Sequence, residues 1–169
     1  GQTSGVKAKV INTDVATSTD PATLYVKYTR TGTSTQTPDF VAPETVLGVH
    51  PTLGNLTGVV QSAETGSAAA VAAGTYYING YAVNVPEQTI VLDKYSNTPS
   101  YRVGLTITES FITPNLDTSL VDNAAGSSNA NAPGAHRFKI ALTLSKLSTS
   151  SIEDSNFVEL MRLEDGRLQ

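Results

Sequence analysis

The chain has 169 residues, no cysteine and a formal net charge of −4 at pH 7, with 11 Lys and Arg against 15 Asp and Glu. This length suits one ordinary domain, and the absence of cysteine excludes disulfides, thiolate metal sites and a thiol nucleophile. The basic residues are scattered singly, which argues against nucleic-acid binding, and the longest apolar run, 68–73, is far shorter than the roughly 20 residues of a membrane helix. We therefore expect neither a nucleic-acid partner nor insertion into a membrane.

Thr and Ser together make up roughly a quarter of the residues, whereas charged residues make up only 15%. Side chains branched at Cβ are restricted in a helix but pack well on a pleated sheet. The composition therefore predicts a mainly β fold: an antiparallel β-sandwich or barrel-like domain with long loops and one short helix. Residues 1–169 are predicted to form one β-rich domain, and because the chain begins at Gly1 with no signal-like segment, we expect a segment of a longer protein.

The N-terminal third predicts two strands followed by a poorly defined region. Apolar residues alternate with Lys over 6–10, and aromatic and branched residues fill 24–30, so these segments are predicted to pair as antiparallel strands across a polar loop. Residues 36–67 are predicted to form a long, weakly defined excursion. Its three prolines each remove a backbone donor, which excludes a continuous central strand there.

The clearest local signal lies in residues 75–85, where Asn79 and Gly80 stand between two runs of aromatic and branched residues. An Asn-Gly pair in this setting predicts a hairpin with a type I′ turn, because both turn positions need a positive φ. We therefore assign Asn79 and Gly80 as a structural turn. Pro86 ends the pairing, and 89–92 is predicted to be the next strand.

Two long strands are predicted in the C-terminal half. Residues 102–112 place Val103, Leu105 and Ile107 on one side, and residues 138–145 alternate apolar side chains with Lys, Ala, Thr and Ser. Both patterns are typical of strands with one buried face.

The remaining C-terminal segments predict one helix and one further strand. Asp117 as N-cap and Gly126 just beyond the end predict a short helix over 118–126. Residues 157–163 read as a strand or a short helix, and we favour a strand because the following Asp-Gly pair is a hairpin signal.

No catalytic or metal-binding pattern stands out in the sequence. His50 and His136 have no second histidine at a ligand spacing, and no nucleophile elbow is present. Glu109, Asp117 and Asp122 lie in one region and raise the alternatives of a cation site or a glycosidase pair, but they lack the oxygen-ligand pattern of a calcium loop. We predict that the protein is not an enzyme and has no catalytic, cofactor-binding or metal-binding residues.

The tyrosines are the most promising contact residues. Tyr76, Tyr77, Tyr81 and Tyr95 are predicted to contact glycan or a protein interface, since aromatic rings with a polar tip suit both. The alternative is that they pack on sheet faces.

Four stretches carry a family resemblance by their order and spacing: 74–81 (GTYYINGY), 90–104 (IVLDKYSNTPSYRVG), 120–124 (LVDNA) and 132–137 (APGAHR). The segment 74–146 resembles a domain of unknown function found in tail-fibre and baseplate proteins of large, contractile-tailed bacteriophages. The flanks 1–28 and 157–169 resemble the segments that bracket this domain, and the likeness is weakest across 39–67.

This resemblance implies a virion component of the phage tail, assembled in the host bacterial cytoplasm, present in three copies and in contact with other tail and baseplate proteins. It brings no known catalytic residue or cofactor. The leading hypothesis is a structural module that holds or connects fibre or spike parts. The alternatives are a receptor-binding module for host surface glycan and a depolymerase that would need a paired carboxylate.

Overall fold

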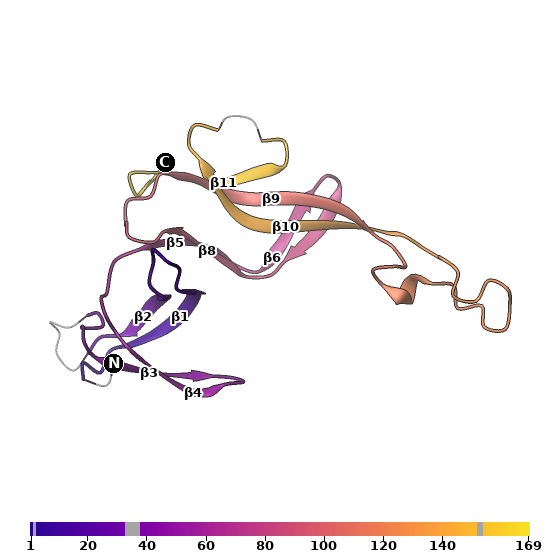
Figure 1. Ribbon diagram of the computed structural model, residues 1–169. Coiled ribbons are helices and arrows are strands. Elements are labelled where there is room, and N and C mark those ends of the chain that lie inside the picture. Colours follow the sequence, from indigo (N-terminus) through magenta and orange to yellow (C-terminus); the bar gives the residue numbers. More distant parts are fainter. Residues whose placement is uncertain (2, 33–37, 152–153) are drawn as a thin grey trace. The chain divides into compact units, whose positions relative to one another are not determined.

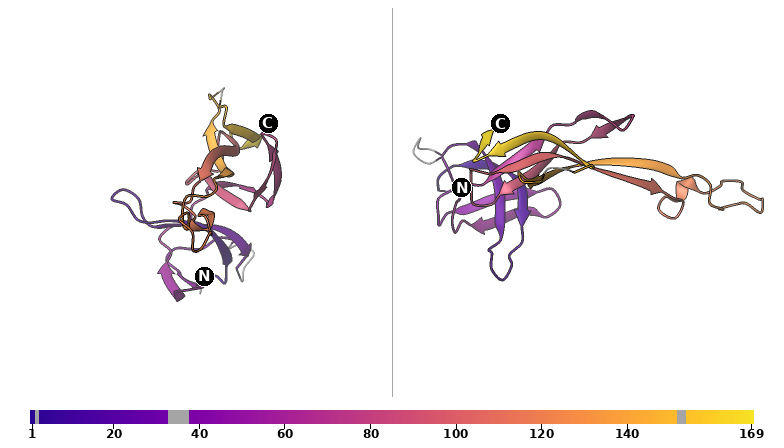
Figure 2. Two further views of the ribbon diagram at one scale, coloured as in Figure 1. Left: turned by 90° about the vertical axis from the view of Figure 1, so that its right-hand side faces the viewer. Right: turned by 90° about the horizontal axis from the view of Figure 1, so that it is seen from above.

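The computed structural model describes residues 1, 3–32, 38–151 and 154–169 (Figure 1). The chain divides into two compact units, one made of Gly1–Ala68 with Val91–Asn97 and the other of Ala69–Ile90 with Thr98–Gln169. The fold is mainly β with antiparallel sheets, which confirms the predicted class, and the described strands close no barrel (Figure 2). Strands β5 (Ser67–Val71) and β8 (Gln88–Asp93) form a further two-stranded sheet.

The first unit begins with the predicted antiparallel pair, β1 (Lys7–Asp14) and β2 (Thr23–Arg30). Strand β1 runs beyond the predicted 6–10 to Asp14, whose carboxylate accepts a 2.6 Å hydrogen bond from the hydroxyl of Tyr25 across the ladder. Residues 12–14, which the sequence predicted as part of a loop, are therefore paired with β2.

A hairpin of β3 (Thr45–His50) and β4 (Gly54–Val59) lies inside the predicted excursion. Local patterns in the sequence do not indicate this hairpin, because prolines interrupt the region. All three prolines lie outside the two strands, and Pro51 begins the turn between them. The part of the excursion at 36–37 falls outside the described residues.

Glu44 is a buried carboxylate that ties the N-terminal segment of the first unit to the residues before β3. It is only 4% exposed, and its oxygens accept hydrogen bonds from the backbone N–H of Val41 and from the backbone N–H and hydroxyl of Ser4. Burial alone would raise the pKa of Glu44, but these hydrogen bonds lower it below the ordinary value. The carboxylate therefore serves as a structural anchor.

The second unit is built on a four-stranded sheet of order β10-β9-β11-β12. Its strands are β9 (Tyr101–Ile112), β10 (Arg137–Ser148), β11 (Phe157–Glu164) and β12 (Arg167–Leu168). Strand β11 confirms the preferred interpretation of 157–163, and a turn at Asp165 and Gly166, both with positive φ, joins it to β12.

The predicted helix over 118–126 is wrong in length. Only a 3-10 turn, η1 (Thr118–Leu120), forms there, and Asp117 caps it by accepting a hydrogen bond from the backbone N–H of Ser119. The chain beyond it turns back, so that the backbone N–H groups of Gly134 and Ala135 donate to the carbonyl of Leu120. These contacts anchor buried Leu120 and stop the helix, and Gly126, with φ of 82°, lies in a later turn rather than at a helix end.

Candidate interaction surface

Strands β9 and β10 present one apolar and one polar face. In their register Leu105 opposes Leu144 and Ile107 opposes Leu142, so the apolar residues that alternate along each strand gather on a single face. Polar residues take the other face, where the hydroxyls of Thr106 and Ser145 form a hydrogen bond. This face separation confirms the period-two pattern predicted for both strands.

The apolar face is covered at one end and uncovered at the other. Val103 and Leu105 are fully buried, whereas Phe111 is 63% exposed and the opposing Phe138 is 43% exposed. The exposed end belongs to the part of the two strands that lies beyond the end of their pairing with β11 (Figures 1 and 2). We call this part, residues 107–112 and 137–142, the arm.

A hairpin of β6 (Gly74–Ile78) and β7 (Tyr81–Val85) packs against the apolar face and reaches into the arm. Asn79 and Gly80 join the two strands with φ of 49° and 89°, the positive values that a type I′ turn needs. The Asn79 side-chain amide donates a 2.9 Å hydrogen bond to the Glu109 carboxylate on β9. The hairpin tip is therefore fastened to the middle of the arm, and Phe111, further along β9, remains exposed.

Three aromatic rings meet where this cover ends. Tyr81 lies 5.7 Å from Phe138, and Phe138 lies 5.5 Å from Phe111, measured between ring centroids, with both pairs tilted. Each ring is between 43% and 63% exposed. We call Tyr81, Phe111 and Phe138 the aromatic cluster. Exposed aromatic residues that adjoin an apolar face are typical of protein contact surfaces.

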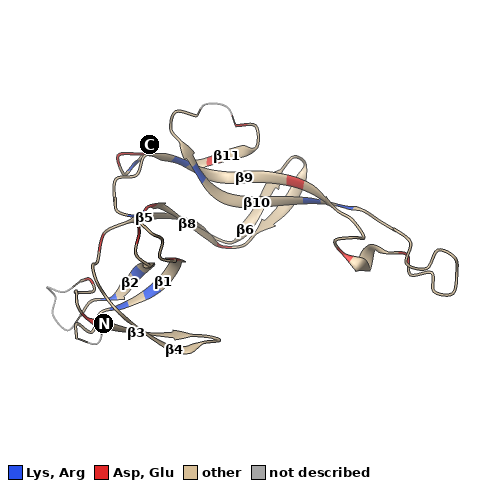
Figure 3. Ribbon diagram, in the orientation of Figure 1, with Lys and Arg blue, Asp and Glu red and all other residues tan. Residues whose placement is uncertain are grey.

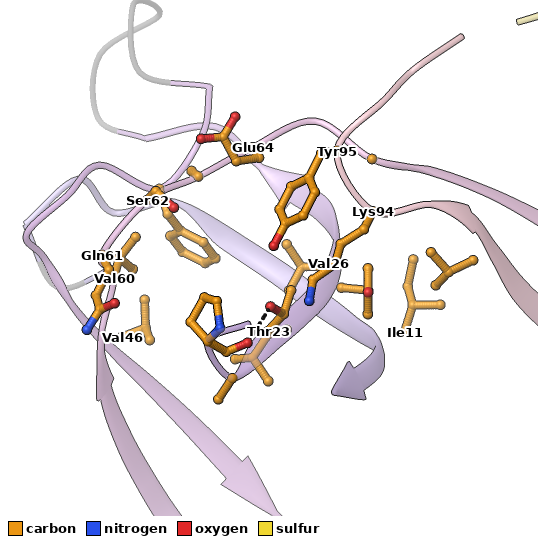
Figure 4. A pocket seen from close by; sticks show the side chains of 18 of the residues that line it. Ile11, Thr23, Val26, Val46, Val60, Gln61, Ser62, Glu64, Lys94 and Tyr95 are labelled. Atoms are coloured by element: carbon orange, nitrogen blue, oxygen red, sulfur yellow. Dashed lines mark hydrogen bonds between the residues drawn. The ribbon is translucent and has the colours of Figure 1, made fainter. Parts of the chain in front are cut away.

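The first unit contains a separate pocket of about 480 Å³, lined mostly by residues of β2, the β3–β4 hairpin, the segment that follows β4, and the residues just after β8 (Figure 4). Tyr28 and Phe40 pack edge to face at its wall with centroids 5.4 Å apart, and Tyr95 and Lys94 lie at its rim. Burial raises the pKa of Tyr28, whose oxygen accepts a hydrogen bond from the Phe40 backbone. The pocket combines aromatic walls with a polar rim, and its volume suits a small ligand.

The protein-family model described as Domain of unknown function (DUF4815) matches residues 54–169. The chain belongs to the DUF4815 family. Comparison with curated proteins found no match, and comparison with solved structures found none either. The DUF4815 region begins at β4 and contains the hairpin, the arm and the aromatic cluster, whereas β1, β2 and β3 precede it.

The four tyrosines predicted as contact residues do not form one platform. Within the hairpin of the DUF4815 region, Tyr76 and Tyr81 share a face, whereas Tyr77 is on the opposite face and 78% exposed. Tyr95 belongs to the first unit, after β8. The structure instead joins Tyr81 to Phe111 and Phe138. Those two residues continue the alternation of the two long strands, which is the signal that could have identified them.

The carboxylates and histidines considered as catalytic or metal-binding candidates have local structural partners. Glu109 bonds Asn79, Asp117 caps the 3-10 turn, and Asp122 accepts a hydrogen bond from the backbone N–H of Ala124. The Nδ1 atom of His50 lies within hydrogen-bond distance of two backbone N–H groups in the turn after β3, and His136 is exposed. Among the described residues no group of three His, Cys, Asp or Glu could hold a metal ion, and no helix has the length and hydrophobicity of a membrane span.

Basic residues oppose one another on the β1–β2 pair, Lys7 with Arg30 and Lys9 with Lys27, and both strands carry blue segments in Figure 3. The second unit contains an ion-pair network. In that network Arg102, 8% exposed, donates to Glu159 on β11 and to Asp154 in the preceding loop. Glu159 also accepts a hydrogen bond from Arg162, and the two arginines, Arg162 first, lower the pKa of Glu159 to about 2. The network fastens β11 to β9, so its role is structural.

Proposed function

We propose that the chain is a structural module of a tailed-bacteriophage virion, located in the tail baseplate or a tail fibre, where it holds or connects fibre or spike parts. The proposal rests on the resemblance of 74–146 to a domain of phage tail-fibre and baseplate proteins. The structural observation that supports it best is the exposed aromatic cluster at the end of an otherwise covered apolar face, because such a surface suits a permanent protein partner. Its partners would be other tail and baseplate proteins and further copies of itself, as a homotrimer.

Localisation in the virion is the direct test. A cryo-electron-microscopy reconstruction of intact virions that contain this protein is expected to show density for the two units in the tail. Complete occupancy of the tail density by other chains would overturn the proposal.

The assembly part of the proposal can be tested in solution by sedimentation of the chain. We expect a trimer at both low and high salt, because only 15% of the residues are charged and apolar contacts are not screened. The double variant Tyr81→Ser and Phe138→Ser is expected to sediment as a monomer. Leu53→Ser, which removes a side chain that is 70% exposed but outside the aromatic cluster, is the matched control and should remain trimeric. A wild-type monomer at both salt concentrations contradicts the trimer, and dissociation by salt contradicts its apolar character.

A second candidate function is recognition of a host surface glycan, in the tail of the same virion. It is favoured by the exposed ring of Tyr77 and by the pocket of the first unit, where Tyr95 stands at the rim. A glycan array separates the possibilities. Binding lost in the pair Tyr77→Ala and Tyr81→Ala would place the glycan on the hairpin, binding lost in Tyr95→Ala would place it in the pocket, and no binding by the wild-type chain would remove this function.

A further inference from the structure

The arm is a two-stranded ribbon with open backbone on both edges. Strand β10 pairs with β9 along its whole length, but β11 pairs with the other edge of β9 only as far as Thr106. The last backbone hydrogen bond on that edge runs from the N–H of Ile107 to the carbonyl of Asn156, at 2.7 Å. Beyond it, no described strand lies on that side of β9. Strand β10 is the outer strand of its sheet along its whole length. A two-stranded ribbon by itself is marginally stable in water, so the arm lacks neighbours that strands usually need.

The side chain of Gln88 closes the edge of β10 at the base of the arm, over residues 142–144 only. Its side-chain amide donates to the carbonyl of Leu142, at 3.0 Å, and accepts from the backbone N–H of Leu144, at 2.8 Å. These are the two groups that a peptide of a neighbouring strand would bond, so the Gln88 amide stands in for that peptide. No described side chain does the same for 137–141. The edge is thus protected against pairing at 142–144 and left available on the arm.

We infer that the edges of the arm are completed by strand pairing with other copies of this chain, β9 of one copy against β10 of the next. The inference rests on the proposed assembly function and adds its geometry. Each copy supplies one open edge of each kind, so a closed ring of copies satisfies every edge. If the copies are related by rotation about an axis along the arms, β9 of one copy runs antiparallel to β10 of the next, as it does within one chain.

Charge selects this pairing over the alternative of two like strands. The arm part of β9 carries Glu109, whereas that of β10 carries Arg137 and Lys139. A contact between two β10 edges brings four basic residues together, and a contact between two β9 edges brings two carboxylates together. Pairing of β9 with β10 avoids both contacts, because Glu109 lies on the apolar face whereas Arg137 and Lys139 lie on the opposite face. It also joins the apolar faces of the arms, so that the aromatic clusters cover one another.

Cross-linking tests the geometry, and it is specific because the chain has no cysteine of its own. Ser110→Cys places a thiol on the arm part of β9, and Lys139→Cys places one on that of β10. The two positions oppose each other within a chain, so each change is made in a separate chain. The two proteins are unfolded together, refolded as a mixture and treated with a short bis-maleimide, which tolerates a shift of register between copies.

Cross-linked dimers that contain one chain of each variant are expected in higher yield than dimers of either variant alone, because like positions of neighbouring copies are two strand spacings apart in the proposed ring. A higher yield of dimers from Lys139→Cys alone than from the mixture would show pairing of β10 with β10 and overturn the inference, as would an absence of cross-links in the mixture. Sedimentation of the same samples distinguishes failure of the strand pairing from failure of the assembly. A trimer without cross-links removes the strand pairing and leaves the homotrimer in place, whereas a monomer removes both; the location in the tail is tested separately by the virion reconstruction.

Gln88→Ala provides a second readout. Removal of the amide opens 142–144 and lengthens the free edge of β10, so we expect tighter association at equal protein concentration, measured by sedimentation. Thr89→Ala, one position along β8 and exposed, is the control and should associate as the wild type does. Association of Gln88→Ala that is unchanged or weaker would show that the edge of β10 takes no part in assembly.

Discussion

The backbone of β11 approaches β9 closely at Gly104. Replacing Gly104 by alanine should therefore strongly destabilise the second unit. The residue is buried in the middle of β9 and paired with Glu159 of β11. A Cβ atom at Gly104 would overlap the carbonyl oxygen of Val158 and would lie 2.8 Å from both the Val158 carbonyl carbon and the Cζ atom of Phe157. Carbon atoms in ordinary contact are about 3.5 to 4.0 Å apart, so the backbone of β11 would have to move by about 1 Å.

The size of the effect follows from what that movement disturbs. Inserting a methylene into a packed core costs about 1 to 3 kcal/mol, and the obstacle here is backbone, which cannot turn aside as a side chain can. We therefore expect Gly104→Ala to lower the free energy of unfolding by about 3 kcal/mol. At roughly 2 to 4 °C per kcal/mol for a chain of this size, the melting temperature should fall by about 6 to 12 °C.

Urea denaturation followed by far-ultraviolet circular dichroism and by tyrosine fluorescence measures this change. Gly74→Ala is the matched control, because Gly74 belongs to the same unit and a Cβ atom there would have Tyr76 Cε2 as its nearest neighbour, at an ordinary 3.8 Å. That variant should remain within about 0.5 kcal/mol of the wild type or become slightly more stable, since alanine has fewer unfolded conformations than glycine. A loss below about 0.5 kcal/mol in Gly104→Ala, or an equal loss in both variants, would refute the predicted close approach of β11.

Three further outcomes are expected. Gly80→Val should lower the free energy of unfolding by about 1 to 3 kcal/mol, because φ of 89° is unfavourable for a β-branched residue, and a loss under about 0.5 kcal/mol in urea denaturation would contradict the turn. The pKa of Glu159 is lowered from 4.5 to about 2, so its stabilising effect is present above pH 4.5 and is lost as the pH falls toward 2. The free energy of unfolding of Glu159→Gln should therefore depend less on pH across this range than that of the wild type. An equal pH dependence in both proteins would show that the ion pairs do not form. The hydrogen bond to Asp14 raises the pKa of Tyr25 to about 12, so the bond stabilises the fold below pH 10 and its contribution is lost as the pH rises toward 12. In an ultraviolet titration of Asp14→Asn, the pKa of one tyrosine should return toward 10. A titration identical to that of the wild type would exclude the bond.

The sequence by itself determined the strand character of this protein and much of its local detail. Period-two alternation in 102–112 and 138–145 depends on nothing but the pleat of a strand, so the apolar faces of β9 and β10 could be predicted from it. The Asn79-Gly80 pair could be interpreted in the same way, because few residues tolerate the backbone angles of a two-residue turn. The cap at Asp117 was also predictable, since a cap uses only the two or three residues that follow it.

Tertiary structure decided the rest. The helix expected after Asp117 stops after one turn because residues from 134 onward bond the carbonyl of Leu120, a contact between segments that no local pattern describes. The aromatic cluster depends on where the β6–β7 hairpin ends over the sheet, which sets Tyr81 against Phe138 and leaves both partly exposed. Local patterns indicate which side of a strand is apolar, but only the packing of distant segments determines how far along the strand that side is covered.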